Sequence, residues 1–231
     1  MISRVVDPCM VFALMLNFYI LGVSRLRMLI VVGALQGVLL GLMYPIVHQD
    51  FAPEGPDGGA AASLGPLGLL RLILLTSAIV GIKGVLIPKM LFQAVLLADI
   101  RPTVSSIIGF TPTLLLGGVG TGAALIFARQ LPLPAGQEQH LLIPSALATV
   151  LAGFLVLVTR REALGQVIGY IVMENGIFIF GLLLIEAVPL LVEFGVVLDL
   201  FVGVFVMGII VNHVSRAFPE ASTEHLRTLR E

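Results

Sequence analysis

Four ionisable side chains fall within apolar stretches of the sequence, where a charge is unfavourable: Arg71, Lys83, Glu174 and Asp199. An uncompensated charge at the centre of a bilayer costs a few kcal/mol or more, so such residues pair with one another and often line ion pathways. A buried carboxyl group tends to keep its proton, and a nearby lysine favours its release. These residue types therefore predict a proton relay formed by Glu174, Asp199 and Lys83.

The two acids are predicted to lie at a similar depth on neighbouring helices. Glu174 lies about ten residues beyond the turn at 159–162, and Asp199 lies about ten residues beyond Pro189. At 1.5 Å per residue, each is roughly 15 Å into a hydrocarbon core that is about 30 Å thick. The turn between the two spans is short, so the two helices should be antiparallel neighbours.

Three further residues are candidates for a supporting role. Asn175 directly follows Glu174 and could orient or hydrate that carboxyl group. Arg71 is predicted near the outer end of its span, where its long side chain can reach the interface and act only structurally. His213 is predicted at the end of the last span, where an interfacial role is an equally simple interpretation.

The relay residues also have a structural interpretation. Glu174 and Lys83 could form an ion pair that only holds two helices together, and Asp199 could hydrogen-bond to a neighbouring helix without titrating. Under that hypothesis the exchange of either acid for its amide would be tolerated, whereas a bulky residue at Gly37 would prevent assembly.

Composition assigns the chain to a membrane class. Of its 231 residues, 58% are apolar and 12% are charged, about half the charged fraction of a typical soluble domain. A net charge of −1 gives no basic surface for nucleic acid. One cysteine and four histidines make a metal or redox centre held by this chain improbable, so we expect no bound cofactor. No nucleophile–base cluster stands out, so no active site of its own is predicted.

The elements that must position these side chains are membrane-spanning helices. A span needs roughly 20 predominantly apolar residues, and backbone groups in lipid must hydrogen-bond within the segment, which favours helices. The sequence predicts an all-α polytopic protein with one transmembrane domain at 1–214 and a polar tail at 215–231. The seven predicted spans are 7–23, 28–48, 64–87, 106–128, 141–159, 164–186 and 188–213. We interpret the first as a retained span and not as a cleaved signal peptide.

The basic residues predict the orientation of these spans in the cell (inner) membrane. With seven spans, nine lysine and arginine residues fall on one side and two, Arg4 and Arg129, on the other. Cytoplasmic loops carry the excess of basic residues, so the N-terminus should lie outside and the C-terminus in the cytoplasm. The nine are Arg25, Arg27, Lys89, Arg101, Arg160, Arg161, Arg216, Arg227 and Arg230.

Small and polar residues predict how the helices contact one another. Glycines spaced four residues apart let helix backbones approach closely, and three such ladders occur: Gly33–Gly37–Gly41, Gly118–Gly122 and Gly165–Gly169. Asn17 and Gln36 are predicted to hydrogen-bond between helices.

Several stretches resemble one family of membrane subunits. The segment QVIGYIVMENGIFIFGLLL at 166–184 resembles the E component of hydrogenase-4 and formate hydrogenlyase-type complexes. The segments 199–214 and 223–231, and the Lys83-Gly-x-x-x-Pro88 stretch, are similar to that family as well. Its last three spans in turn resemble the K subunit of complex I, which carries a buried glutamate in each of its last two spans. The resemblance implies that Glu174 stands for the first of these, offset by about one helical turn, and Asp199 for the second.

The resemblance implies a membrane-arm subunit of a respiratory-type oxidoreductase complex. Antiporter-like subunits would be its partners in the membrane, and a soluble arm with nickel–iron and iron–sulfur centres would carry out the redox chemistry. The subunit would contribute its buried acids to the translocation of protons or sodium ions. Two alternatives remain: a purely structural docking subunit of the complex, and an independent secondary ion transporter. No inverted repeat supports the transporter.

Overall fold

The computed structural model describes residues 3–50, 66–97, 103–131 and 141–184, together with residues 194, 195, 197, 198, 201 and 208. Within these ranges the chain contains six helices that are long and apolar enough to cross a membrane. The predicted all-α membrane architecture is confirmed. The predicted seventh span at 188–213 lies outside the described residues, apart from the isolated positions above, which are helical; the tail at 215–231 lies outside them entirely.

Five of the six spanning helices are single α-helices that overlap predicted spans: α1 (Ser3–Gly22), α2 (Leu26–Asp50), α6 (Phe110–Ala128), α7 (Leu142–Thr159) and α8 (Ala163–Leu184). The remaining spanning helix has three parts, α4 (Pro66–Gly81), the π-helical turn η1 (Ile82–Leu86) and α5 (Ile87–Leu97). The sequence predicted that this span ends at residue 87 and that a connecting stretch begins at Pro88. Instead the helix continues to Leu97, because the wider π-helical turn accommodates the proline that would otherwise interrupt a regular helix.

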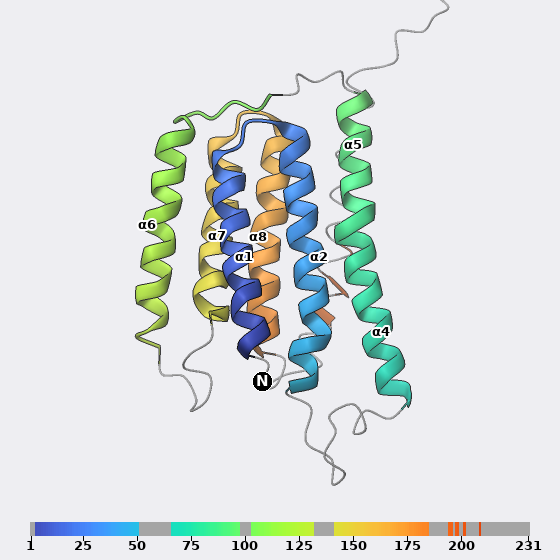
Figure 1. Cartoon of the computed structure of the whole chain (residues 1–231). Coiled ribbons are helices and arrows are strands. Elements are labelled where there is room, and N and C mark those ends of the chain that lie inside the picture. The colour runs from blue at the N-terminus through green and yellow to red at the C-terminus, as the bar shows by residue number, and fades with distance from the viewer. Residues whose placement is uncertain are drawn as a thin grey trace, which may run out of the picture.

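Helices α7 and α8 form the centre of the bundle, and α1 and α2 lie beside them (Figure 1). Glycines explain the close α7–α8 contact. A Cβ atom at Gly153 would overlap the backbone of Met173, and one at Gly169 would overlap the backbone of Leu157. The outer helices are α6, which packs on α1 and α7, and α4–η1–α5, which packs on α2.

The predicted glycine ladders are used unequally. On α2, a Cβ at Gly37 would lie 2.9 Å from the Cβ of Lys83, and one at Gly41 would lie 2.8 Å from Val80 Cγ2, so this ladder lets η1 and α4 approach. On α6 the predicted pair at 118 and 122 faces open space: a Cβ at Gly122 has nothing within 4 Å, and one at Gly118 reaches only Phe18, at 4.0 Å. The glycine of α6 that permits close packing is Gly117, against Leu21.

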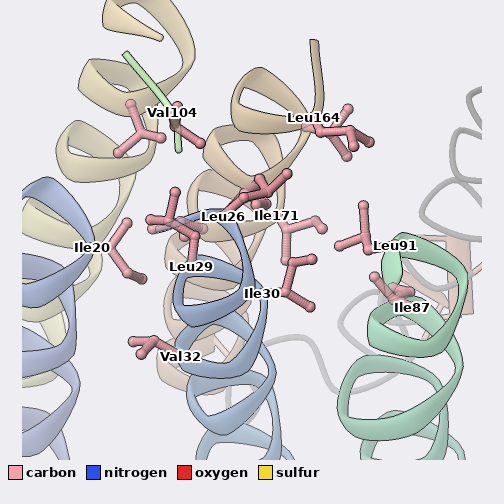
Figure 2. Close-up of a cluster of buried hydrophobic side chains, with 14 of the residues drawn as sticks. Ile20, Leu26, Leu29, Ile30, Val32, Ile87, Leu91, Val104, Leu164 and Ile171 are labelled. Carbon is pink, nitrogen blue, oxygen red and sulfur yellow. The ribbon is translucent and has the colours of Figure 1, made fainter. Parts of the chain in front are cut away.

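Two apolar clusters fill the bundle, one toward each end. The first joins α1, α2, α5, α7 and α8 near the end that carries the α1–α2 turn, and Figure 2 shows part of it, with Leu29 and Ile30 of α2 beside Ile87 and Leu91 of α5. The second lies toward the other end and includes Tyr44. The six polar side chains of the bundle interior, described first below, lie between the two clusters.

An extended segment before α6, residues 103–109, lies at one end of the bundle (Figure 1) and hydrogen-bonds to the α1–α2 turn and to the end of α7. We call this segment the strap, and the end it covers the strap face. The Val104 amide donates to the Ser24 carbonyl at 2.6 Å, and the Ile107 amide donates to the Thr159 carbonyl at 2.8 Å. Gly109 ends the strap with φ at 86°, a conformation that glycine adopts without steric cost.

Candidate functional site

Six polar side chains from five helical elements form a continuous set of contacts inside the bundle. We call this set the buried polar chain, and each member is at most 4% exposed. A polar group buried without partners is strongly disfavoured, so a run of hydrogen-bonded and ion-paired groups across an apolar bundle is a specific arrangement. Its members are Asn17 on α1, Gln36 on α2, Lys83 on η1, Thr149 on α7, and Glu174 and Asn175 on α8.

One end of the buried polar chain is an ion pair. Lys83 Nζ lies 3.2 Å from Glu174 Oε1, and each side chain is 3% exposed. The same ammonium donates a hydrogen bond to Asn175 Oδ1 at 3.2 Å and lies 5.1 Å from the centre of the Phe178 ring. The structure therefore brings together three residues that the sequence singled out, Lys83, Glu174 and Asn175, and adds an aromatic face that sequence reasoning did not predict.

Local backbone structure places Lys83 in this position. It is in the π-helical turn, where the Ile87 amide donates to the carbonyl of Ile82, five residues earlier. Pro88 follows this turn and has no amide hydrogen to donate, which favours a local departure from the regular α-helical pattern. π-Helical turns occur often at functional sites. Opposite the turn, Gly37 leaves room for the base of the Lys83 side chain.

Carboxamides continue the buried polar chain from the ion pair to the far side of the bundle. Asn175 Nδ2 donates to Gln36 Oε1 at 3.3 Å, and Gln36 Nε2 donates to Asn17 Oδ1 at 2.9 Å. Asn17 Nδ2 then donates to Thr149 Oγ1 at 2.8 Å. The predicted interhelical hydrogen bonding of Asn17 and Gln36 is confirmed. Sequence reasoning missed Thr149, because a single threonine in an apolar span carries no distinctive signal.

A small pocket reaches Lys83 from the side of α2, α5 and α8. Its volume is about 10 Å³, at the lower limit of what can hold one water molecule. Figure 2 shows part of its lining, including Ile30, Ile87 and Ile171. The other lining residues are apolar, so the pocket contacts the buried polar chain at Lys83.

The other predicted site residues are not part of this cluster. Arg71 is exposed on α4, twelve residues before Lys83, which is roughly 18 Å along a helix. Asp199 and His213 lie outside the described residues, so their place in the site remains a prediction. Within the described ranges, no group of three histidine, cysteine, aspartate or glutamate side chains is arranged to hold a metal ion.

A second buried charge lies at the strap face, where sequence reasoning predicted only a basic turn. The side chain of Arg160 is fully buried, and its guanidinium lies 4.7 Å from the centre of the Phe110 ring. Burial lowers the pKa of Arg160, and the nearby Glu162 carboxylate partly opposes this effect. The Arg160–Arg161 doublet resembles a solvated turn in sequence, so nothing indicated the burial. Arg160 Nη2 donates to the last carbonyls of α1 and its turn: Ile20 at 3.1 Å, Leu21 at 3.2 Å and Val23 at 3.1 Å.

Glu162 anchors the strap to the α7–α8 turn. Its Oε1 accepts hydrogen bonds from the Ser105 amide at 2.9 Å and from Ser105 Oγ at 2.7 Å. Partial burial of Glu162 acts to raise its pKa, but the hydrogen bonds from Ser105 outweigh that effect, with a smaller contribution from Arg160. The pKa of Glu162 is therefore lowered overall.

The fold and the site define a class: a polytopic helical membrane protein with an ion pair and a carboxamide chain buried among its helices. The chain is 38% identical over 89 residues to an uncharacterised protein of Mycobacterium tuberculosis, covering 38% of this chain and 40% of that protein. It is 33% identical over 101 residues to Hydrogenase-4 component E of Escherichia coli K12, covering 44% of this chain and 46% of that protein.

The same identity and coverage hold for Hydrogenase-4 component E of Shigella flexneri. In each case the chain matches less than half the length of the curated relative. No protein-family model matches the sequence, and no solved structure matches it. The partial similarity to Hydrogenase-4 component E agrees with the resemblance predicted from 166–184, and shows that part of this chain is similar to a hydrogenase-4-type membrane protein.

Proposed function

We propose that the chain is a membrane-arm subunit of a hydrogenase-4-like oxidoreductase complex, and that its buried Lys83–Glu174 pair takes part in moving protons or sodium ions. The observation that carries this proposal is the 3.2 Å contact between two charged side chains that are each 3% exposed. The partial match to Hydrogenase-4 component E supports the choice of complex.

The position of the pair favours a role in ion movement. Glu174 is near the middle of α8, and Lys83 is near the middle of the helix at 66–97, so both lie far from either end of the bundle. A buried ion pair is a weak stabiliser, because removing two charges from water offsets most of their attraction. Apolar residues would hold the same helices together at least as well, so a charged pair at this depth is better explained by function.

In this proposal Glu174 takes up and releases the ion, and Lys83 provides the charge that tunes it. Asp199 is proposed as a second acid at similar depth on the strength of the sequence. The pocket at Lys83 provides space for a water molecule next to the pair. Nickel–iron and iron–sulfur centres belong to partner subunits, and this chain binds neither. The strap face is proposed to be cytoplasmic and the N-terminus to lie outside.

The proposal is tested on the complex purified through a tag on this chain in a mild detergent. Mass spectrometry should identify antiporter-like membrane subunits and redox subunits. After reconstitution in liposomes, the unmodified complex should couple electron transfer to ion movement. The Glu174→Gln complex should contain the same subunits and retain electron transfer to an artificial acceptor, but lose coupled ion movement.

Glu138→Gln is the matched control, since it makes the same chemical change in the polar stretch at 129–140, and it should behave as the unmodified complex. Normal ion movement in the Glu174→Gln complex would rule out the relay and favour a structural docking subunit. Purification of the chain by itself as a homo-oligomer would rule out the complex, and would favour an independent ion transporter.

A further inference from the structure

Two arginines at the start of α2 are exposed and unpaired within the described part of the chain. Arg25 directly precedes the helix and Arg27 lies in its first turn. Neither side chain forms a hydrogen bond or an ion pair with another described residue. Glu162 is the acidic residue of the strap face within the described ranges, but it lies in the α7–α8 turn and accepts hydrogen bonds from Ser105. Two positive charges therefore remain uncompensated beside the α1–α2 turn.

Helix stability does not explain why arginines occupy these positions. The N-terminal end of a helix carries a partial positive charge and favours acidic side chains. The first turn of α2 contains no acidic residue, and Arg25 and Arg27 add positive charge there instead. A bound anion would compensate the two arginines and the end of the helix together.

An exposed apolar stripe continues along α2 from Arg27. Val31 and Leu35 follow at intervals of four residues, which keeps them on the same helix face, and they are 48% and 44% exposed. The opposite face, with Leu29 and Ile30, packs into the bundle (Figure 2). Leu35 is eight residues or about 12 Å beyond Arg27 along the helix, close to the roughly 15 Å that one leaflet contributes to the hydrocarbon core.

Helix α1 adds an exposed surface beside this stripe. It packs on α2 and is joined to it by the short turn at the strap face (Figure 1). Tyr19, three residues before the end of α1, is 44% exposed, and Met15, one turn further from the strap face, is 63% exposed. Tyrosine is enriched where the hydrocarbon core meets the polar headgroup layer, so Tyr19 agrees with a membrane interface at the level of the two arginines.

We propose that Arg25 and Arg27 bind the headgroup of an anionic phospholipid, one acyl chain of which lies along Val31 and Leu35. A guanidinium binds phosphate oxygens through paired, charge-assisted hydrogen bonds. A free phosphate ion would contact the arginines and leave the apolar stripe uncovered, whereas a phospholipid matches both. This inference goes beyond the proposed function, because it depends neither on ion movement nor on which side of the membrane the strap face lies.

The chain contains no tryptophan, so Leu35→Trp places a single fluorescent reporter in the stripe. The full-length chain is reconstituted in phosphatidylcholine bilayers, and phosphatidylglycerol or phosphatidylcholine with brominated acyl chains is added to quench the tryptophan. Comparison of the two lipids gives their relative association constant at this position. Phosphatidylglycerol should be favoured by about 25-fold, since each arginine near a bilayer surface contributes about 1 kcal/mol, or about fivefold. Arg25→Gln and Arg27→Gln together should reduce the ratio to about one.

Two controls separate a local site from a general charge effect. Val119→Trp places the reporter on α6, where residue 119 is 70% exposed and nine residues, or about 14 Å, from the start of the helix; it should show no preference for phosphatidylglycerol. Arg161→Gln removes an exposed charge from the α7–α8 turn and should leave the preference at Leu35→Trp unchanged. Val31→Trp repeats the measurement if Leu35→Trp does not fold.

A ratio near one in the chain that retains both arginines would overturn the inference. Equal losses from Arg161→Gln and Arg27→Gln would also overturn it, because the preference would then arise from the summed charge of the strap face. In the purified complex, the photo-crosslinking residue p-benzoylphenylalanine in place of Leu35 should attach to phospholipid, and attachment to another subunit would show that a protein covers the stripe instead. None of these outcomes bears on whether the Glu174→Gln complex moves ions, so the two proposals fail independently.

Discussion

Two buried cations are stabilised by acceptors of different kinds. Lys83 in the bundle interior has a carboxylate, a carboxamide oxygen and an aromatic face as neighbours. Arg160 at the strap face donates to backbone carbonyls at the end of α1 and lies over the Phe110 ring. The carbonyls at a helix C-terminus lack intrahelical partners and carry partial negative charge, so Arg160 caps α1 through Nη2 and its charge is partly compensated. The arrangement at Arg160 is suited to holding structure, whereas that at Lys83 lies within the proposed ion relay.

Glu162 should make the attachment of the strap sensitive to acid. Its pKa is lower in the folded protein than its ordinary value of about 4.3. Its stabilising contribution is therefore fully present above that ordinary value, and is lost as the pH falls through the lowered pKa. Hydrogen exchange at the Ser105 amide, which donates to Glu162, should accelerate in this acidic range.

The Glu162→Gln variant retains a neutral acceptor for Ser105 and cannot titrate at this position. After correction for the intrinsic pH dependence of exchange, protection of the Ser105 amide should be independent of pH in this variant. A pH dependence equal to that of the unmodified chain would show that another group controls the strap.

From sequence alone, the charged and amide residues of the site and their depth in the membrane could be predicted. Lys83, Glu174 and Asn175 were singled out because ionisable and amide groups are conspicuous in an apolar span. The order of the hydrogen bonds from Asn175 to Thr149 could not be predicted, because it depends on which helices are neighbours and on how each helix is rotated about its axis. The roles of Phe178 and Arg160 could not be predicted, because aromatic residues are common in membrane spans and an arginine in a turn is usually solvated.

At the scale of elements, glycines determine how closely the two central helices approach. The Gly169 position on α8 faces the backbone of Leu157 and the carbonyl of Gly153 on α7. Backbone atoms cannot move aside as a flexible side chain can. The α7–α8 contact should therefore be less tolerant of an added methyl group than any position where the glycine faces open space.

Gly169→Ala should destabilise the bundle by about 1–3 kcal/mol, the usual cost of overpacking a close contact. Gly122→Ala on α6 is the matched control, because a Cβ there meets nothing within 4 Å. It should be neutral or slightly stabilising, since alanine favours a helix over glycine by roughly 0.5–1 kcal/mol. Unfolding measured in mixed detergent micelles compares the two, and equal effects would contradict the assignment of α7–α8 as the close contact.

The existence of the helices could be predicted from hydropathy alone, and five of them overlap predicted spans without major revision. The C-terminal end of the third span could not be predicted in this way, because Pro88 and the weakly polar residues after it favoured an end to the helix. The π-helical turn that admits Pro88 depends on packing against Gly37 and Val38 of α2, which is tertiary information. Glycine spacing likewise indicated which helices can pack closely, but not which face of α6 is covered.

At the scale of the whole molecule, the helices differ greatly in how much of their surface the chain itself covers. In the most apolar windows of α7 and α8, 61% of residues are buried, against 17% for α6 and 28% for the helix at 67–96. The two poorly covered helices are the outermost helices of the described bundle on opposite sides (Figure 1). Within the described part of the chain these two faces are left to lipid, to neighbouring subunits or to the predicted seventh span, and cover by a neighbour is consistent with the proposed place in a larger membrane arm.

The orientation of the bundle can be tested with single cysteines. Cys9 is first replaced by alanine, and a cysteine is then introduced in place of Arg27, beside the α1–α2 turn, or Arg129, at the end of α6; both positions are exposed. If the strap face is cytoplasmic, a membrane-impermeant thiol reagent added to intact cells should label position 129 and not position 27. Both should react after permeabilisation, and the reverse pattern would invert the proposed orientation.

The long helix formed by α4, η1 and α5 is longer than the hydrocarbon core of a bilayer is thick. Its apolar stretch of 30 residues is about 45 Å long at 1.5 Å per residue, whereas the hydrocarbon core is about 30 Å thick. Even a tilt of about 40°, the upper end of the range for membrane helices, leaves roughly 34 Å to cover. Arg71 and Lys89 are both exposed on this helix and lie 18 residues apart, about 27 Å along its axis, so the two charges can lie at the two edges of the hydrocarbon core while the apolar turns beyond them extend into the headgroup layers or against a neighbouring protein.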